Sequence, residues 1–157
     1  MSNIKIFIAK VKSVLDAISP TIGKVYGYEP LARDWPDYLS LFKVSPPPTP
    51  PYPQIAGWII TRSKTIEEPG AIKTNKRTNT ILIRGIFSLD EKGASGEVFQ
   101  DNIEKICDAF RPLYNLDGLL LTSSPIQVDV VDVRKFGDIL CHYCELSISA
   151  VEEIQWT

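Results

Sequence analysis

The spacing of hydrophobic residues predicts an amphipathic helix near the start of the chain. Between residues 2 and 18 the apolar positions recur at the period of one helix face, while Lys5, Lys10, Lys12 and Asp16 lie elsewhere. The apolar positions are Ile4, Phe7, Ile8, Val11, Val14, Leu15 and Ile18. Pro20 and Gly23 then end the helix.

Two short elements are predicted next. Residues 24–28 form a short extended piece. Asp34 has the side chain that an N-cap needs, and Pro36 is tolerated in the first turn of a helix. We therefore expect a short helix that begins after Asp34 and reaches about Phe42.

Two strands are predicted in the middle of the chain. Residues 54–62 contain Trp58, Ile59 and Ile60, and residues 78–89 place mostly apolar side chains on one face. Those side chains are Asn79, Ile81, Ile83, Gly85, Phe87 and Leu89. The segment between them is rich in Thr, Lys, Glu, Pro and Gly, has no apolar periodicity and is too long for a tight turn. We therefore expect a hairpin with a mobile tip at 63–77.

The last third of the chain predicts one helix and two long strands. A helix capped by Ser95 or its neighbour has an apolar stripe of Phe99, Ile103, Ile106, Cys107, Phe110 and Leu113. Residues 126–133 and 139–151 are long strands joined by a tight turn at 136–138. Residues 119–122 are a further strand candidate.

This order of elements predicts an α+β fold, with a mainly antiparallel sheet of four to five strands packed against two or three helices. The 157 residues fit one domain, 1–157. The hydrophobic content of 44% and the charged content of 23% are ordinary for a globular protein.

A proline-rich segment lies at 45–53 inside this domain. Proline fixes φ and removes the backbone donor, so the segment predicts a polyproline II connector and excludes a sheet interior. A ligand for an SH3 or WW domain is the functional alternative. However, the PxxP motifs lack a correctly placed basic residue, and Pro50-Pro51-Tyr52 lacks the spacer of PPxY. We therefore interpret the segment as a stiff connector.

Composition excludes several kinds of partner. The formal net charge of −2 gives no long-range attraction to nucleic acid or to an anionic membrane. The longest apolar runs, 81–83 and 118–121, are far shorter than the roughly 20 residues of a membrane helix. The N-terminus lacks the features of a signal peptide, and the three cysteines are typical of reduced thiols in cytoplasm. We expect neither membrane binding nor sequence-specific nucleic-acid binding.

The Cys141-His142-Tyr143-Cys144 stretch is the most conspicuous chemical motif. Its apolar flanks predict a strand, where Cys141 and Tyr143 lie on one face and His142 and Cys144 on the other. The two thiols then cannot share a metal or a disulfide. His142 and Cys144 are half of a possible zinc site, but the sequence offers no obvious remaining ligands. Because Leu140, Leu146, Ile148 and Ala150 continue that face, we expect packed core residues and no metal.

The sequence contains no recognisable catalytic set. It has no GxSxG motif, one histidine, and no glycine loop with the spacing of a phosphate-binding site. Asp129, Asp132, Glu152 and Glu153 are expected to be solvated strand positions, with a metal-assisted carboxylate pair left as an alternative. We therefore expect no enzymatic activity and no cofactor.

The 63–77 tip and the residue before it carry the candidate partner-binding residues. They are Arg62, Lys64, Lys73, Lys76 and Arg77, and they outnumber Glu67 and Glu68. A solvated hairpin tip and a segment that orders when a partner docks are both compatible with this composition. Aromatic residues concentrate at Trp35, Tyr38, Phe42, Tyr52 and Trp58, where most are expected to be core and one or two to anchor a subunit interface.

The order of these pieces resembles the tail terminator and tail-completion proteins of long-tailed bacteriophages. The resemblance spans most of the chain and is carried by the order of weak motifs. After the N-terminal amphipathic helix these are Val-Tyr-Gly-Tyr-Glu-Pro at 25–30, Gly-Trp-Ile-Ile at 57–60, Ile-Arg-Gly-Ile-Phe-Ser-Leu at 83–89 and Leu-Cys-His-Tyr-Cys-Glu-Leu at 140–146. The proline run departs from the family's pattern.

The resemblance implies a structural virion protein of the tail, assembled in the host cytoplasm. Such a subunit forms a homo-oligomeric ring, typically a hexamer, that caps the tail tube, stops its polymerisation and joins it to the head-side connector. Its partners would be other copies of itself, the tail-tube protein and the head–tail connector protein. A head–tail connector or head-completion (neck) subunit is the alternative, because it also assembles as a ring.

Overall fold

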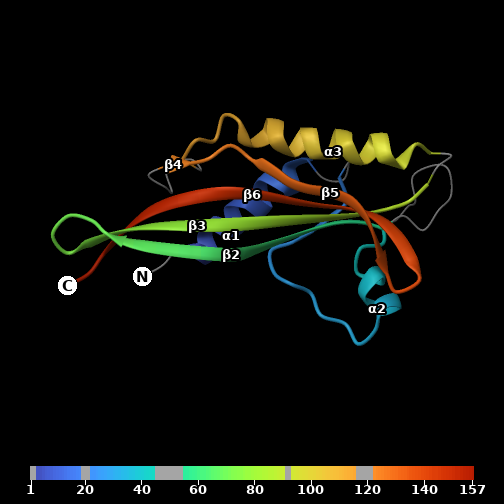
Figure 1. Ribbon diagram of the computed structural model, residues 1–157, viewed down its shortest axis with the longest axis horizontal. Helices are drawn as coiled ribbons and strands as arrows, with labels where there is room; N and C mark the ends of the chain where they lie inside the picture. Colours follow the sequence, from blue (N-terminus) through green and yellow to red (C-terminus); the bar gives the residue numbers. More distant parts are fainter. Residues whose placement is uncertain (1–2, 19–21, 45–54, 91–92, 116–121) are drawn as a thin grey trace.

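The described part of the chain forms a six-stranded sheet flanked by three helices (Figure 1). The computed structural model describes residues 3–18, 22–44, 55–90, 93–115 and 122–157. The elements are α1 (Ile4–Ile18), β1 (Lys24–Tyr26), α2 (Trp35–Ser40), β2 (Ala56–Pro69), β3 (Thr74–Ser88), α3 (Ser95–Phe110), β4 (Thr122–Ser123), β5 (Gln127–Phe136) and β6 (Ile139–Gln155). The predicted α+β class with a mainly antiparallel sheet is confirmed. The proline-rich segment, Tyr52 and most of the predicted 119–122 strand lie outside the described residues.

The sheet is built around β6. Its neighbours follow the order β1-β2-β3-β6, and the far side of β6 is shared by β4 and β5. Among the strands of the described residues, only β1 pairs in parallel, with β2, and every other pair is antiparallel. The β5–β6 turn contains Gly137 at φ +64, a left-handed conformation that favours glycine. The predicted hairpin at this position is therefore confirmed.

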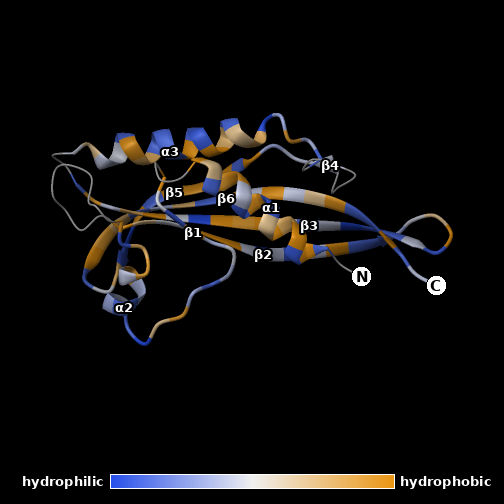
Figure 2. Cartoon of the chain, turned by 180° about the vertical axis from the view of Figure 1, so that it is seen from behind, coloured by the Kyte–Doolittle hydropathy of each residue, from blue (hydrophilic) through white to orange (hydrophobic). Residues whose placement is uncertain are grey.

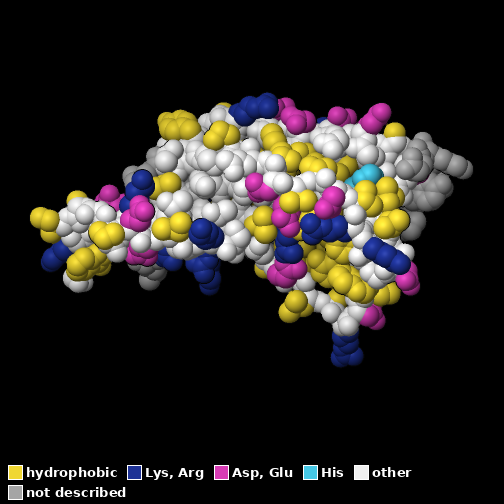
Figure 3. All heavy atoms as spheres, viewed as in Figure 1, with side chains coloured by type: hydrophobic (Ala, Val, Ile, Leu, Met, Phe, Trp, Pro, Cys, Tyr) yellow, Lys and Arg dark blue, Asp and Glu magenta, His cyan; other side chains and the backbone are white. Residues whose placement is uncertain are grey.

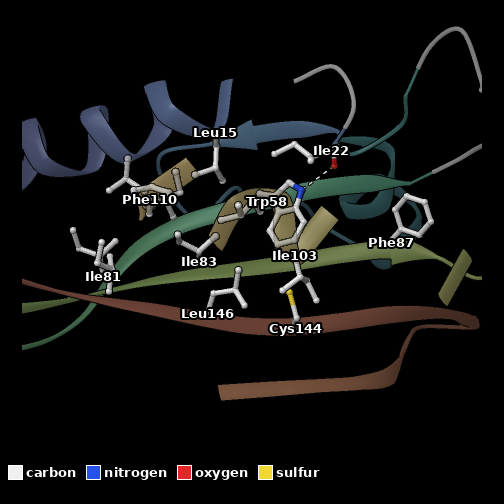
Figure 4. Close-up of a cluster of buried hydrophobic side chains, with 14 of the residues drawn as sticks. Leu15, Ile22, Trp58, Ile81, Ile83, Phe87, Ile103, Phe110, Cys144 and Leu146 are labelled. Atoms are coloured by element: carbon white, nitrogen blue, oxygen red, sulfur yellow. Dashed lines mark hydrogen bonds between the residues drawn. The ribbon is translucent and has the colours of Figure 1, made fainter. Parts of the chain in front are cut away.

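The larger core lies between one face of the sheet and the helices α1 and α3. The predicted apolar stripes of both helices supply it, with Phe7, Val11 and Leu15 from α1 and Phe99, Ile103, Ile106 and Phe110 from α3. Trp58 lies at its centre, where the indole Nε1 donates a 2.8 Å hydrogen bond to the carbonyl oxygen of Ile22 (Figure 4). The outward side of α3 is hydrophilic (Figure 2), as its amphipathic pattern requires.

A smaller core occupies the opposite face of the sheet, at the end where α2 packs. It contains Leu39 and Phe42 together with Ile59, Ile86 and Cys141. The predicted N-cap of α2 is confirmed, because the Asp37 amide donates a 2.9 Å hydrogen bond to Oδ1 of Asp34. The sheet therefore separates two cores of unequal size.

Helix α3 begins where it was predicted, because Ala94, the neighbour of Ser95, takes the N-cap position at φ 50, without a side-chain cap. The Ser95 hydroxyl accepts a hydrogen bond from the Asp90 amide at 2.8 Å. Two other sequence-based expectations were wrong in detail. Leu140 is 51% exposed, although it shares the face of the buried Cys144 and Leu146. The irregular tip expected at 63–77 is mostly strand, since β2 and β3 pair as far as Pro69 and Asn75.

No described helix is long and apolar enough to cross a membrane.

Candidate interaction surfaces

The end of the β2–β3 hairpin projects beyond α1 and α3 (Figure 1). We call residues 62–79 of β2 and β3, with residues 150–155 of β6, the arm. It is a three-stranded ladder in which the Arg77 backbone lies between Glu67 of β2 and Glu152 of β6. At its tip Ile72 is 92% exposed and Trp156, just past β6, is 53% exposed. The arm is therefore an ordered projection that ends in apolar side chains.

The five basic residues predicted to bind a partner all belong to the arm but do not form one patch. Arg62 and Arg77 lie on the face that continues the larger core, because they share alternation with Ile81 and Asn79. Lys64 and Lys76 lie on the opposite face, and Lys73 lies in the turn at φ 57.

The carboxylates of the arm neutralise part of this positive charge. Glu67 lies 3.8 Å from Nε of Arg77, and Lys76 lies between Glu68 and Glu153 in the ladder. Among the described residues, Arg62 and Lys64 form no ion pair, and both are exposed. Lys73 and Lys76 likewise form no ion pair among the described residues, so unpaired positive charge extends from the base of the arm to its tip.

A buried polar network fixes the base of the arm. Thr65 Oγ1 donates to Oδ1 of Asn79 at 2.8 Å, and Nδ2 of Asn79 donates to Oε1 of Glu152 at 3.1 Å. Asn79 is fully buried and Glu152 is 4% exposed. The expectation that Glu152 is solvated was wrong, because its side chain continues the core face of β6, where its Oε1 accepts from Asn79. Glu153, Asp129 and Asp132 are exposed, as expected.

A groove of about 670 Å³ separates α3 from β5. Phe99 and His142 lie along it, with ring centroids 5.6 Å apart in a stacked arrangement. The histidine reaches the surface beside hydrophobic side chains (Figure 3). Its Nε2 is 2.9 Å from Oγ of Ser95. Three carboxylates line the groove, from Glu97, Asp101 and Asp132, whereas its described lining contains no lysine or arginine. The groove is therefore acidic.

The outer wall of this groove is an open sheet edge. Strand β5 pairs with β6 on one side, and no described residue pairs with its other side. Nearly all of its residues are exposed, including Val128 at 46%, Val131 at 40% and Val133 at 50%. Val131 and Val133 lie opposite Cys144 and His142, so they face the groove. An apolar edge strand of this kind is a ready template for another strand.

An aromatic pocket of about 590 Å³ lies at the end of the sheet opposite the arm. Trp35 packs edge-on against Tyr38 and Phe136, with ring centroids 5.6 and 5.7 Å apart, and is itself 50% exposed. Arg84 of β3 lies in the pocket and forms an ion pair with Glu29. Trp, Tyr and Arg are the side chains enriched at interface hot spots. Of the aromatic residues that could anchor a subunit interface, Trp35 is therefore the strongest candidate.

Beside this pocket, Arg134 stacks on a tyrosine from β6. Its guanidinium carbon lies 3.9 Å from the ring centroid of Tyr143, whose hydroxyl donates to Oε1 of Glu145 at 2.7 Å. Burial, followed by the hydrogen bond and the negative charge of Glu145, raises the pKa of Tyr143 to about 12. This cluster joins β5 to β6 on the face opposite the groove.

The Cys-His-Tyr-Cys stretch is a strand with its two thiols on opposite faces, as predicted. Cys144 lies in the larger core and Cys141 in the smaller one, and both are fully buried. Burial raises the pKa of Cys141 to about 11 and that of Cys144 to about 12. Both remain protonated thiols at neutral pH, which disfavours nucleophilic or redox chemistry. No group of three metal-ligating side chains occurs within the described ranges.

The acidic groove and the aromatic pocket were missed by reasoning from sequence. Each is assembled from segments far apart in the chain, such as Glu97 with Asp132 and Glu29 with Arg84. The signals that existed were the unusual run of valines alternating with aspartates in β5 and the aromatic residues at 35 and 38. Comparison with known proteins gives no family, because no family model and no curated protein sequence matches the chain.

Proposed function

We propose that this protein is a phage tail terminator: a structural virion subunit that assembles into a hexameric ring, caps the tail tube, stops its polymerisation and joins it to the head-side connector. The single observation that carries the proposal is the unprotected edge of β5. Ten residues of strand have a free backbone side within the described chain, and three of its valines are 40–50% exposed.

An edge of this kind argues for an assembly subunit. Proteins that remain monomeric usually shield edge strands with charge, proline, a bulge or a covering loop. Here the bulge and the charge are only partial protection, because the bulge affects the start of β5 near Asp129 and leaves Val131 and Val133 exposed. Covering the edge with another protein surface would remove both the exposed valines and the unpaired backbone groups from water.

The two ends of the molecule also differ in the way that termination requires. A terminator must bind the tube through one ring face and present an opposite face that does not propagate the tube. One end of this sheet carries the charged arm with Ile72 at its tip, whereas the other carries the aromatic pocket around Trp35. Two chemically different ends can bind two different partners, which in this proposal are the tail-tube protein and the connector protein.

The buried chemical groups favour a binding role without turnover. Ser95 is 4% exposed and its hydroxyl already contacts both the Asp90 amide and His142. A nucleophile must reach its substrate, and this hydroxyl is enclosed. The raised pKa values of Cys141 and Cys144 leave neither thiol ionised near neutral pH.

Elongation of tail tubes tests this function. Tail-tube protein would be polymerised in vitro with and without this protein, and tube lengths measured by negative-stain electron microscopy. A terminator caps one end of each tube and stops growth at a stoichiometry of one ring per tube. Tubes that grow unchanged, with bare ends, would contradict the proposal. Binding to heads that display a connector, with no binding to tubes, would assign the protein to the alternative neck class.

A further inference from the structure

We propose that the acidic groove between α3 and β5 binds the arm of a second copy of this chain, with the open edge of β2 adding to the open edge of β5. This contact rests on the ring assembly proposed above and names the surfaces that form the ring. It follows from the backbone pairing, the charges and the side-chain alternation of the two edges.

Both edges have unpaired backbone groups. Strand β1 pairs only with Gly57–Ile59 of β2, so that β2 from Ile60 to Pro69 has no described partner on its outer side. Strand β5 likewise has no described pairing partner on its outer side. Main-chain hydrogen bonds between two such edges are the usual basis of strand addition. Each copy therefore has an unpaired strand at both edges of its sheet, and the β2 edge of one copy can pair with the β5 edge of the next.

The directions of the strands suit a ring. Successive pairs in the order β2-β3-β6-β5 are all antiparallel, so β2 and β5 run in opposite directions within one copy. Neighbouring copies related by rotation about an axis inclined to the strands keep these directions, and β2 of one then meets β5 of the next in antiparallel fashion. The inclination is required because, in the register given below, Arg62 is level with Ile148 of β6 whereas Val133 is level with His142, so the two copies are offset along the strands. The contact joins two different surfaces, which generates a ring when the rotation closes.

The charges of the two surfaces are complementary. The groove presents the carboxylates of Glu97 and Asp101, with Asp132 at its rim. Asp132 already forms an ion pair with Arg134, whose Nε lies 3.1 Å from Oδ1 of Asp132, so Lys64 would join this pair in the complex. The open part of β2 presents Arg62 and Lys64, which form no ion pair within the described part of the chain. Complementary potentials steer association and fix register, while like charges across an interface cost several kcal/mol.

One register matches both the side-chain alternation and the charges. With the same side of the sheet toward the helices in both copies, Arg62 lies opposite Val133, where it reaches Glu97 and Asp101 of the groove. The bulge after Arg62 then places Lys64 opposite Asp132 on the other face, and Ile66, which is 46% exposed, opposite Val130. In this set Lys64 meets a carboxylate and Ile66 meets a valine.

Charge exchange tests the contact. Lys64→Glu and Asp132→Lys would be made singly, combined in one chain, and mixed as two singly substituted proteins, with mass measured by light scattering. Each single variant is expected to raise the dissociation constant between subunits by about tenfold or more, because it creates a like-charge pair. Both the double variant and the mixture restore a Lys–carboxylate pair at every contact, so both are expected to assemble.

Matched controls separate this contact from a general effect of charge. Glu104→Lys changes the same charge on an exposed position of α3 outside the groove lining, and Lys73→Glu changes it in the arm turn outside the pairing region. Both are expected to assemble like the wild type. Circular dichroism would verify that every variant is folded.

The outcomes distinguish this inference from the proposed function. A wild-type ring that survives both single substitutions, or single variants that the exchange does not rescue, overturns the arm–groove contact and leaves the terminator function standing. A wild-type chain that stays monomeric overturns the contact, and the elongation of tail tubes then decides the function separately.

Discussion

Nδ2 of Asn79 donates a hydrogen bond of 3.1 Å to Oε1 of Glu152, and this buried pair joins two strands separated by 73 positions in the sequence. Both side chains lie at the point where the apolar core ends and the arm begins, beyond Ile81 and Ile148. The pair lets the sheet continue past its core without leaving a buried amide unsatisfied. It therefore connects the stability of the domain to the position of the arm.

Removing the carboxylate from this pair is expected to destabilise the protein. Glu152→Ala should lower the free energy of unfolding by about 1–3 kcal/mol, because it leaves the buried Asn79 amide without this acceptor. Glu152→Gln keeps an amide oxygen in place and should cost less. Urea unfolding measures both. Glu153→Ala, one residue along on the exposed face, should stay within about 0.5 kcal/mol of wild type. Equal losses at 152 and 153 would show that the network contributes nothing.

Adding a methyl group should have opposite effects on protein stability at two of the glycines. A Cβ at Gly85 would lie 2.4 Å from the Trp58 ring and 2.8 Å from Sγ of Cys144, so Gly85→Ala should lower the free energy of unfolding by about 1–3 kcal/mol through overpacking. A Cβ at Gly96 would lie 3.6 Å from Cε1 of His142, which is ordinary contact. Because Gly96 lies in α3, Gly96→Ala should be neutral or stabilising by up to about 1 kcal/mol. Thermal denaturation compares them, and a Gly85→Ala protein as stable as wild type would contradict the packing around Trp58.

The β5–β6 turn should depend on glycine for two separable reasons. Gly137 has φ +64, and a Cβ there would lie 2.9 Å from Cβ of Trp35. Gly137→Ala should therefore lower the free energy of unfolding by about 1–2 kcal/mol from the left-handed backbone alone. The contact with Trp35 adds to that cost. In a Trp35→Gly background, which removes Cβ as well as the ring, the contact is relieved and the backbone cost remains, so the same substitution should be less harmful. A double-mutant cycle by urea unfolding measures this coupling, and strictly additive effects would exclude the contact.

The buried thiols predict a loss of stability at alkaline pH. Burial raises the pKa of Cys141 to about 11 and that of Cys144 to about 12 from an ordinary value of 9.0. Raised values mean that the folded state holds these protons more tightly than the unfolded chain. Their contribution is therefore complete below pH 9 and is lost as the pH rises through 11 to 12. Urea midpoints at pH 8 and pH 10.5 should fall more steeply for wild type than for a Cys141→Ala/Cys144→Ala variant, whereas parallel falls would exclude the thiols as the cause.

The sequence predicted those parts of the fold in which one face of an element is clearly apolar. The stripe of α1, the alternation of Ile81 and Ile83, and the tight turn around Gly137 each have a strong local signal. It also predicted that the two thiols of the Cys-His-Tyr-Cys stretch lie on opposite faces, because strand alternation depends on backbone geometry alone.

The arm was missed because its strands are polar on both faces. Thr65, Glu67 and Arg77 continue the core face of the sheet, but nothing apolar marks them as strand residues. Glu152 was misjudged for a related reason, since a carboxylate at the end of a strand is usually solvated and its buried partner Asn79 is far away in the sequence. The groove and the aromatic pocket depend on tertiary placement, which local patterns do not encode.

The mass and shape of the purified protein test the central claim most directly. Light scattering across a wide range of concentrations, with negative-stain electron microscopy of the same samples, is expected to show a closed ring with the mass of six chains. The open edge of β5 would then be covered by the neighbouring subunit. A strict monomer at every concentration, with tail tubes left uncapped in its presence, would contradict the account.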